Sequence, residues 1–334
     1  MDWFETLTGF QERNYAETRT QFEISGQQLI SRVNGRRYAI GELELPSLNE
    51  LRTRGTDVCV PGRLRVRNLA DDVRRLHASE EFEHALFQVA SQFNLLEMTG
   101  PSVTPEDGVT RYQSDRTQGP ACAIAAGAAT IYRNYFVPVG DGIGQTADRQ
   151  IDALADLRDA LAARLGSPKD ALWTMENGYA LASRESLKAI NTVLRDDSEA
   201  EALKGLLRIG IHWDVEVTDV GPPGPRVSQA FCSALPVAYS AAPAADWALF
   251  GPLVLEAAYE ATLWAALINA SRGASNKVLL TRLGGGAFGN PDAWIDEALT
   301  RALELFAEHG LEVILVSYRS TAERALQLEE RFRG

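Results

Sequence analysis

The chain has 334 residues, of which 45% are hydrophobic and 23% are charged, which is typical of a soluble globular protein with one large domain or two modest ones. Its formal net charge of −12 and the lack of a basic stripe exclude a nucleic-acid backbone as the main partner, although backbone amides still bind small anions. The three cysteines and four histidines show no metal-ligand spacing, so we predict no metal site and a reducing compartment.

The sequence predicts no membrane-directed segment. The N-terminal stretch MDWFETLTGFQERNY carries acidic residues early and has no apolar region typical of a signal peptide. The longest apolar region, residues 247–270, is interrupted by Glu256 and Glu260, and therefore predicts a buried helix. We expect a cytoplasmic protein that contacts no membrane.

The first 70 residues predict an accessory segment. Residues 1–20 have a polar helical pattern, and residues 22–45 predict two or three short strands with Asn34-Gly35 as a hairpin turn. A short helix begins after Pro46, and residues 61–68 predict a loop or an edge strand. The segment either docks a substrate or covers the sheet of the main domain.

Residues 71–334 predict one larger domain of mixed type. Apolar residues have helical spacing from Asp71 to Gln92, residues 100–119 are long and polar, and the Ala-rich residues 120–134 predict a buried helix. The remaining expected strands are 135–139, 173–181 (a strand or loop), 209–217, 227–239, 277–283 and 311–318, and the remaining expected helices are 145–165, 183–207, 249–270 and 292–308. This alternation predicts a mixed or parallel sheet between two helical layers, a three-layer α/β/α fold.

The most informative motif is KVLLTRLGGGAFGN, residues 277–290. An apolar run typical of a strand leads into a glycine-rich loop, and helical spacing begins directly afterwards at Pro291 and Asp292. Glycine lets the main chain approach an anion because no Cβ stands in the way, and helix starts offer free N–H groups. The motif therefore predicts a phosphate-binding loop.

A second polar constellation lies upstream. Asn94 and Glu97 follow the expected helix 71–92, and Asp115 and Gln118 open the next helix. Two carboxylates and two amides near a helix start suit a hydroxylated ligand. The alternative is structural, since Asp115 as a helix cap would only satisfy free N–H groups.

These motifs carry a resemblance to a known family. GGGAFGN resembles the second ligand loop of macrodomains of the poly(ADP-ribose) glycohydrolase type, and FNLLEM resembles their first loop, whose asparagine contacts the terminal ribose. With DRTQGPACA, RNYF, MENGYAL and QAFCSALPVAY, they are similar to a microbial branch that includes effector hydrolases removing ADP-ribose from arginine. The resemblance covers most of residues 70–334. It implies a macrodomain-like mixed sheet between helices, with an N-terminal hairpin and helical extension, in a domain spanning residues 71–334 after an accessory segment of residues 1–70.

The resemblance also implies roles for individual residues. The ligand-binding set that it implies is Asn94, Gln118, Gly284, Gly285, Gly286, Ala287, Phe288, Gly289, Asn290 and Tyr318. The glycine loop would hold the diphosphate, Phe288 and Asn94 would contact the distal ribose, and Tyr318 would lie against adenine or only pack at the rim. Glu97 and Asp115 would be the catalytic pair, because cleavage at C1″ passes through an oxocarbenium-like state that carboxylates stabilise.

One departure bears on the reaction. The tandem glutamates of poly(ADP-ribose) glycohydrolases are absent, and Gln118-Gly119-Pro120 stands in that neighbourhood, which disfavours cleavage of the polymer. The first hypothesis is therefore an ADP-ribosyl hydrolase acting on an arginine-linked protein, delivered to a host cytosol if it is an effector. The second is a macrodomain reader that binds ADP-ribose without cleaving it, and the third is a glycosidase or nucleotide hydrolase of another fold. No cofactor is expected besides the ligand ADP-ribose, the partner is an ADP-ribosylated protein, and the oligomeric state stays open.

Overall fold

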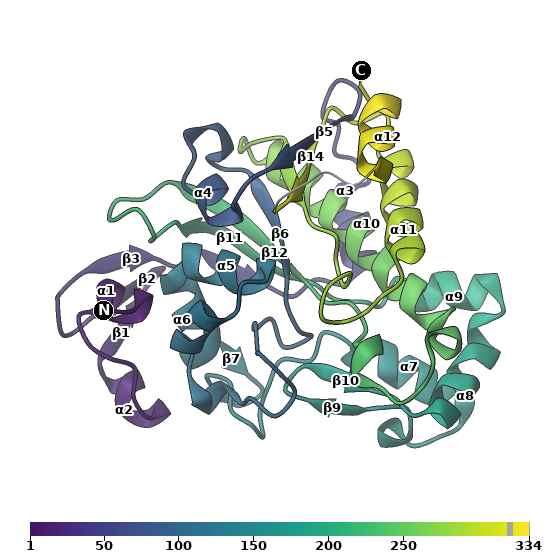
Figure 1. The fold of residues 1–334 in the computed structure, drawn as a ribbon, viewed down its shortest axis with the longest axis horizontal. Coiled ribbons are helices and arrows are strands. Elements are labelled where there is room, and N and C mark those ends of the chain that lie inside the picture. Colours follow the sequence, from purple (N-terminus) through teal and green to yellow (C-terminus); the bar gives the residue numbers. More distant parts are fainter. Residues whose placement is uncertain (319–322, 334) are drawn as a thin grey trace.

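The centre of the molecule is a seven-stranded mixed sheet (Figure 1). The structure is a computed structural model that describes residues 1–318 and 323–333. In spatial order the strands are β4 (Glu42–Glu44), β11 (Gly210–Glu216), β12 (Arg226–Cys232), β6 (Leu86–Ala90), β13 (Lys277–Leu280), β14 (Glu312–Ser317) and β5 (Arg65–Ala70). Neighbouring strands from β12 to β5 are parallel, whereas β11 is antiparallel to both of its neighbours.

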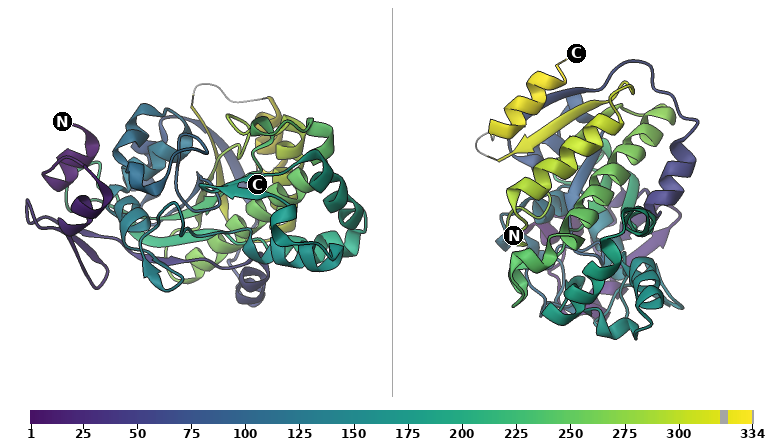
Figure 2. Two further views of the ribbon diagram at one scale, coloured as in Figure 1. Left: turned by 90° about the horizontal axis from the view of Figure 1, so that it is seen from below. Right: turned by 90° about the vertical axis from the view of Figure 1, so that its right-hand side faces the viewer.

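Helices cover both faces of this sheet. On one face, α10 (Phe250–Ser271) packs against the middle strands. The same apolar cluster includes α3 (Leu48–Gly55), α7 (Ala155–Leu165), α8 (Arg184–Leu194), α9 (Asp197–Lys204) and α11 (Asp292–Leu305). The other face packs against α4 (Val73–His77), α5 (Gln118–Ala125) and α6 (Gly127–Tyr135). Within β13, Val278 and Leu280 face the first layer and Leu279 faces the second, as the two-residue period of a strand requires. The expected three-layer α/β/α fold is confirmed (Figure 2).

The N-terminal residues form a small module at one end of the molecule (Figure 2). It contains α1 (Trp3–Thr8), α2 (Tyr15–Thr20) and a three-stranded antiparallel sheet of β1 (Phe22–Ser25), β2 (Gln28–Ser31) and β3 (Arg37–Ala39). Its core packs against α5 and α6. Strands β4 and β5, however, belong to the main sheet, so the sheet continues across the boundary expected at residue 70. We use "N-terminal module" below for residues 1–40.

The largest correction to the expected elements concerns residues 71–92. The expected single helix is a short α4, a 3₁₀ turn at Glu80–Phe82 and the strand β6 in the middle of the sheet. Leu86, Phe87 and Val89 are fully buried because helices cover both faces of the strand. A strand buried on both faces has no alternation of polar and apolar residues, so its apolar run also fits a helical pattern.

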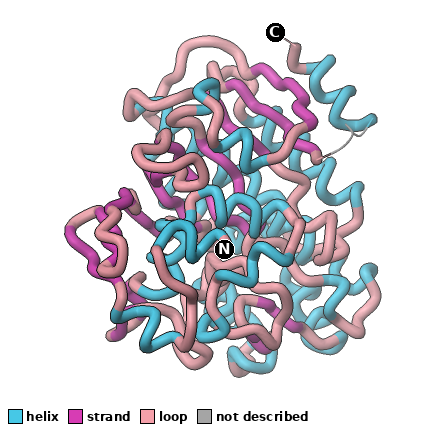
Figure 3. The backbone as a smooth tube through the Cα atoms, turned by 60° about the vertical axis from the view of Figure 1, so that its left-hand side comes forward, coloured by secondary structure: helices cyan, strands magenta, loops and turns pink. Residues whose placement is uncertain are grey.

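Smaller corrections concern the bounds of other elements. Figure 3 shows how helices, strands and loops are distributed along the backbone. Residues 183–207 form two helices, because Asp196 caps α9 by accepting from the N–H groups of Ser198 and Glu199. Residues 145–154 precede α7 without helix, and the strand expected at 227–239 ends at Cys232. The remaining elements are the hairpins β7 (Pro138–Val139) with β8 (Gly142–Ile143) and β9 (Thr174–Glu176) with β10 (Tyr179–Leu181), and α12 (Glu323–Arg331). Among the described helices, including the 22-residue α10, none has the length and apolarity needed to cross a bilayer.

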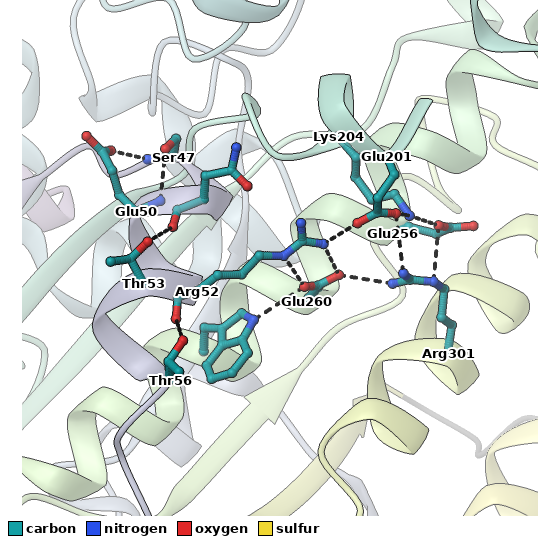
Figure 4. A network of polar contacts seen from close by, with 12 residues as sticks. Ser47, Glu50, Arg52, Thr53, Thr56, Glu201, Lys204, Glu256, Glu260 and Arg301 are labelled. Atoms are coloured by element: carbon teal, nitrogen blue, oxygen red, sulfur yellow. Dashed lines mark hydrogen bonds and ion pairs between the residues drawn. The ribbon is translucent and has the colours of Figure 1, made fainter. Parts of the chain in front are cut away.

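A buried carboxylate joins three helices on one side of the sheet (Figure 4). The Glu260 side chain in the middle of α10 is 2% exposed, and its two oxygens bind Arg52 of α3 at 2.6 Å and Arg301 of α11 at 3.0 Å. Burial opposes ionisation, but the hydrogen bonds from both arginines outweigh it and lower the pKa of Glu260. The acidic residue that interrupts the apolar run of α10 is thus a cross-link between helices.

We expect Glu260→Gln to lower the free energy of unfolding by about 2 kcal/mol, because the charge-assisted hydrogen bonds from Arg52 and Arg301 lose their anionic acceptor. The matched control is Glu308→Gln, which breaks the pair with Arg63, whose side chains are 74% and 77% exposed. An exposed pair contributes roughly 0–1 kcal/mol, so that variant should unfold almost like the parent. Urea denaturation measures both, and equal losses would contradict the cross-link.

Candidate functional site

A cavity of about 410 Å³ lies at the carboxyl ends of neighbouring strands of the sheet. Segments that follow β12, β6, β13 and β14 line it, together with the start of α5. Ligands of open α/β sheets bind at this edge, because loops from several strands meet there. The predicted residues that line it are Glu97, Asp115, Gln118, Gly284, Gly286, Ala287, Phe288 and Tyr318.

Gln118 closes the gap where two strands separate. Strand β13 pairs with β6 only at Leu86 and Phe87, so the rest of that edge of β6 has no strand partner. There the Gln118 side chain accepts from the Ala90 N–H at 2.9 Å and donates to the Gln88 carbonyl at 2.7 Å. Its amide therefore fixes α5 to the sheet. The oxygen and the nitrogen of this amide each already have a backbone hydrogen-bond partner.

The loop after β6 is closed by its own amides. Gln92 donates to the Met98 carbonyl and accepts from the Met98 N–H, while Asn94 accepts from the Leu96 N–H at 3.0 Å and donates to Gln150 at 2.8 Å. Asn94 is fully buried and does not line the cavity. The structure thus corrects two expectations: Asn94 follows a strand instead of a helix, and its side chain shapes the loop instead of facing the ligand space.

The same loop presents Glu97 to the cavity. Glu97 is 1% exposed, and its Oε1 lies 3.3 Å from the buried guanidinium of Arg133, whereas its Oε2 is buried with no hydrogen-bond partner in the described chain. Burial raises the pKa of Glu97 to about 7, although Arg133 acts in the opposite direction. A buried oxygen without a partner is costly, and is therefore a candidate for contact with a ligand or a reacting group.

Asp115 lies across the start of α5. Its Oδ1 accepts from the Thr117 N–H at 2.8 Å and from the Thr117 hydroxyl at 2.7 Å. The N-cap of α5 is Thr117, so Asp115 supports the residue that begins the helix without being the cap itself. Its other oxygen, Oδ2, accepts no hydrogen bond from the described residues. In Asp115, therefore, Oδ1 stabilises the start of α5, whereas Oδ2 is available to a ligand in the cavity.

The glycine loop needs glycine at two positions for its shape. Gly284 and Gly289 have φ of +75° and +68°, and a Cβ on Gly284 would lie 2.4 Å from the Cβ of Ala234. Asn290 closes the loop, because its N–H donates to the Gly284 carbonyl at 3.0 Å and its side chain donates to the Leu235 carbonyl at 2.9 Å. Asn290 and Gly289 thus build the loop, and neither they nor Gly285 line the cavity.

The middle of the loop leaves donors available. In the described part of the chain, the N–H groups of Gly286, Ala287 and Phe288 donate to no acceptor, and all three residues line the cavity. A Cβ on Gly286 would meet no atom within 4 Å. Arg116 is exposed, also lines the cavity, and forms no ion pair with the described residues. Consecutive free amides and a guanidinium in one cavity suit an anion such as a diphosphate.

Aromatic rings form one end of the cavity. The Phe288 ring lies 5.3 Å from that of Tyr179 and 5.8 Å from that of Tyr239. At the other end, Tyr318 is 68% exposed, and borders a second cavity of about 500 Å³ that shares Asp115, Arg116 and Tyr318 with the first. The two cavities together can hold an elongated ligand.

Several residues of the site have no signal in the sequence. Arg133, Tyr112, Tyr179 and Tyr239 are distant in sequence from the residues that they contact. RNYF, MENGYAL and QAFCSALPVAY contain three of them, but their spacing assigns no role to any single residue. Only the fold brings them to the loops after β6 and β13.

Comparisons with known proteins give structural neighbours of low similarity. No protein-family model and no curated protein matches the chain. Poly(ADP-ribose) glycohydrolase from Thermomonospora curvata, bound to the inhibitor ADP-HPD, is 12% identical with a TM-score of 0.42, over 94% of this chain and 94% of that chain. The enzyme from Deinococcus radiodurans in complex with ADP-ribose is 14% identical with a TM-score of 0.40, over 86% of this chain and 93% of that chain. At this level the likeness says nothing of the chemistry of the cavity.

Proposed function

We propose that this chain is a hydrolase that releases ADP-ribose from a mono-ADP-ribosylated protein, with arginine as the modified residue. The observation that carries the proposal is the buried Glu97 carboxyl, whose Oε2 has no partner in the described chain and which lines the cavity of the glycine loop. A loop that binds a diphosphate would place the neighbouring ribose near this carboxyl.

The proposed ligand position follows from the two adjoining cavities. The diphosphate would bind the N–H groups of residues 286–288 and the guanidinium of Arg116. The distal ribose would then lie toward Glu97 and Phe288, and adenine would extend past Tyr318 into the second cavity. Gln118 and Asn290 would support this arrangement from behind, through the bonds that hold α5 and the loop.

The proposed chemistry is hydrolysis of the C1″–N bond. The bond breaks with its electron pair moving to the guanidine nitrogen, and the oxygen of a water molecule bonds to C1″. Glu97 in its ionised form would accept the proton of this water, which finally rests on the strongly basic guanidine. A carboxyl with a pKa of about 7 is suited to accepting and releasing a proton near neutral pH.

Acidic and aromatic groups support a cationic leaving group. Asp115 has an oxygen without a described partner, and its negative charge is among the causes that raise the pKa of Tyr179, after burial and the neighbouring Tyr239. A guanidinium between a carboxylate and aromatic faces gains both ion-pair and cation–π attraction. We therefore place Asp115 at the arginine, with Glu97 at the water.

A reader that binds ADP-ribose without cleaving it is the alternative function. One observation favours it: both carboxylates have structural partners, Glu97 in Arg133 and Asp115 in Thr117. Turnover on arginine-linked, glutamate-linked and poly(ADP-ribose) substrates in parallel separates the two functions. Binding without release from any substrate would support the reader.

We expect ADP-ribose to raise the melting temperature, because a ligand that binds only the folded state stabilises that state. Gly286→Val should abolish the shift while the protein stays folded, since the new side chain projects into open space at the free amides. Differential scanning fluorimetry at millimolar ADP-ribose measures both. An unchanged melting temperature of the parent protein would contradict the proposed ligand.

Gly289→Val is the matched comparison for this experiment. Gly289 has a φ of +68°, and its Cβ would lie 2.8 Å from that of Ala238, so this variant should lose stability even without ligand. If Gly286→Val abolishes the ligand-induced shift but leaves the melting temperature of the free protein unchanged, the substitution acts on binding. If the melting temperature of the free protein also falls, the substitution damages the loop.

A further inference from the structure

We infer that the N-terminal module is a clamp that holds both carboxylates of the cavity in position, with Glu12 as its positioning residue. The inference deepens the proposed function and rests on it for the effect on turnover. The sequence leaves the role of this segment open between docking a substrate and covering the sheet. The contacts of Glu12 point to a third role.

Glu12 binds the polar loop between β6 and α5. Its carboxylate accepts from the Val109 N–H at 2.9 Å, from the Thr110 N–H at 2.6 Å and from the Tyr135 hydroxyl at 2.7 Å. Gly108 lies so close that a Cβ there would be 2.5 Å from the carboxyl carbon of Glu12. Two adjacent amides on one carboxylate form charge-assisted bonds, which are stronger than bonds between neutral groups.

Trp3 adds a second attachment to the same loop. Its indole N–H donates to the Thr110 carbonyl at 3.2 Å, so the module binds both backbone groups of Thr110. Phe4 and Leu7 of α1 pack with Tyr112, which is fully buried. The segment Thr110–Ser114, a 3₁₀ helix, is thus held by residues at least 97 positions away in sequence.

Tyr112 in this helix connects the clamp to both carboxylates. Its hydroxyl accepts from the Glu97 N–H at 3.2 Å, and its carbonyl accepts from the Asp115 N–H at 3.1 Å. A shift of the 3₁₀ helix therefore moves the two carboxylates together. Misplacement of a catalytic group by 1 Å can reduce turnover by about 10²-fold, so small changes at Glu12 are expected to matter.

The test compares Glu12→Gln with Glu23→Gln, a control on β1 of the same module whose side chain is 51% exposed. The amide introduced by Glu12→Gln keeps one acceptor oxygen for three donors, so the clamp loosens without loss of the buried apolar contacts of the module. We expect kcat on the arginine-linked substrate to fall roughly tenfold per folded molecule, while the affinity for free ADP-ribose changes less than about twofold. Glu23→Gln should leave both unchanged.

A double-mutant cycle separates positioning from general stability. If Glu12 acts through the two carboxylates, then Glu12→Gln should cost little further turnover in a chain that already carries Glu97→Gln and Asp115→Asn, because the effects share one route. A purely structural role predicts a lower melting temperature with full turnover per folded molecule, and independent effects in the cycle. That result would overturn the inference.

Hydrogen exchange tests the clamp without any substrate. Amides of residues 109–115 and 97 should exchange faster in Glu12→Gln than in Glu23→Gln, at equal global stability. If exchange speeds up but the parent protein releases ADP-ribose from no substrate, the clamp is supported and the proposed function fails. If the parent turns over substrate and Glu12→Gln changes neither exchange nor kcat, the clamp fails and the proposed function stands.

Discussion

Glu97→Gln is expected to lower the release of ADP-ribose from an arginine-linked protein by roughly two to four orders of magnitude, the range usual for losing a positioned proton acceptor. Gln preserves the size and one acceptor oxygen of the side chain, but it accepts no proton from water. Affinity for free ADP-ribose should change much less, because the phosphates bind the glycine loop. Single-turnover kinetics and a binding isotherm on the same preparation separate these quantities.

The pH dependence of turnover gives a second measure of Glu97. Its pKa of about 7 predicts that kcat/KM of the parent rises between about pH 6 and 8, as the carboxyl ionises. This rise of kcat/KM with pH should be absent from the residual activity of Glu97→Gln. If kcat/KM of the variant still rises over this pH range, the titration belongs to another group.

The same pKa makes a prediction about stability. The folded chain keeps the Glu97 proton up to about pH 7, while the unfolded chain loses it near the ordinary value of 4.5, so the contribution of Glu97 to stability is present at low pH and lost as pH rises through 7. The stability of Glu97→Gln relative to the parent should therefore increase across this window, by at most about 1.4 kcal/mol per pH unit. Burial lowers the pKa of His77 and of His212, which act in the opposite direction but cancel in this difference.

The matched control for Glu97→Gln is Glu260→Gln. Glu260 is 1% exposed, lies outside the cavity, and accepts from the guanidinium groups of Arg52 and Arg301. Its replacement should cost stability through these bonds, with full turnover per folded molecule. If the two variants lose turnover equally, the effect comes from folding, and Glu97 is not catalytic.

The contrast between β6 and β13 shows which parts of the fold are readable from sequence. The strand β13 was predicted because a glycine loop ends it sharply and a helical pattern follows. Strand β6 has neither signal, and its fully buried residues Leu86 and Phe87 fit a helical period equally well. A buried strand can therefore be recognised only where the residues that follow it mark its end, since burial on both faces removes the two-residue period of polar and apolar residues.

The residues of the candidate site likewise divide into those that the sequence predicts and those that only the fold reveals. The glycine loop and its neighbours were predicted because their chemistry is local to one turn. For Asn94 only the family resemblance of FNLLEM implies contact with the ligand, yet its side chain closes a loop with Leu96 and Gln150. The partners Glu12 and Arg133 depend on contacts between distant segments, which a single sequence does not contain.

Asp115→Asn is expected to lower turnover on the arginine-linked substrate by roughly 10²-fold, a size usual for losing an electrostatic partner of the reacting groups. Asn retains an oxygen that accepts from the Thr117 N–H, so the start of α5 should stay intact. The charge is lost, and with it the attraction for a cationic guanidinium.

Asp115→Ala provides the comparison that isolates the contribution of Asp115 to stability. It removes the support of Thr117 as well as the charge, and should lower the free energy of unfolding by about 1 kcal/mol, whereas Asn should cost less. If only support of the helix matters, Ala loses stability, and both variants keep turnover per folded molecule. If the carboxylate holds the arginine, both variants lose turnover equally. The loss is then larger on arginine-linked than on glutamate-linked protein, because only the former carries a cationic guanidinium at the linkage. Full turnover in Asp115→Asn would remove this carboxylate from the reaction and shift the assignment toward Glu97 acting alone.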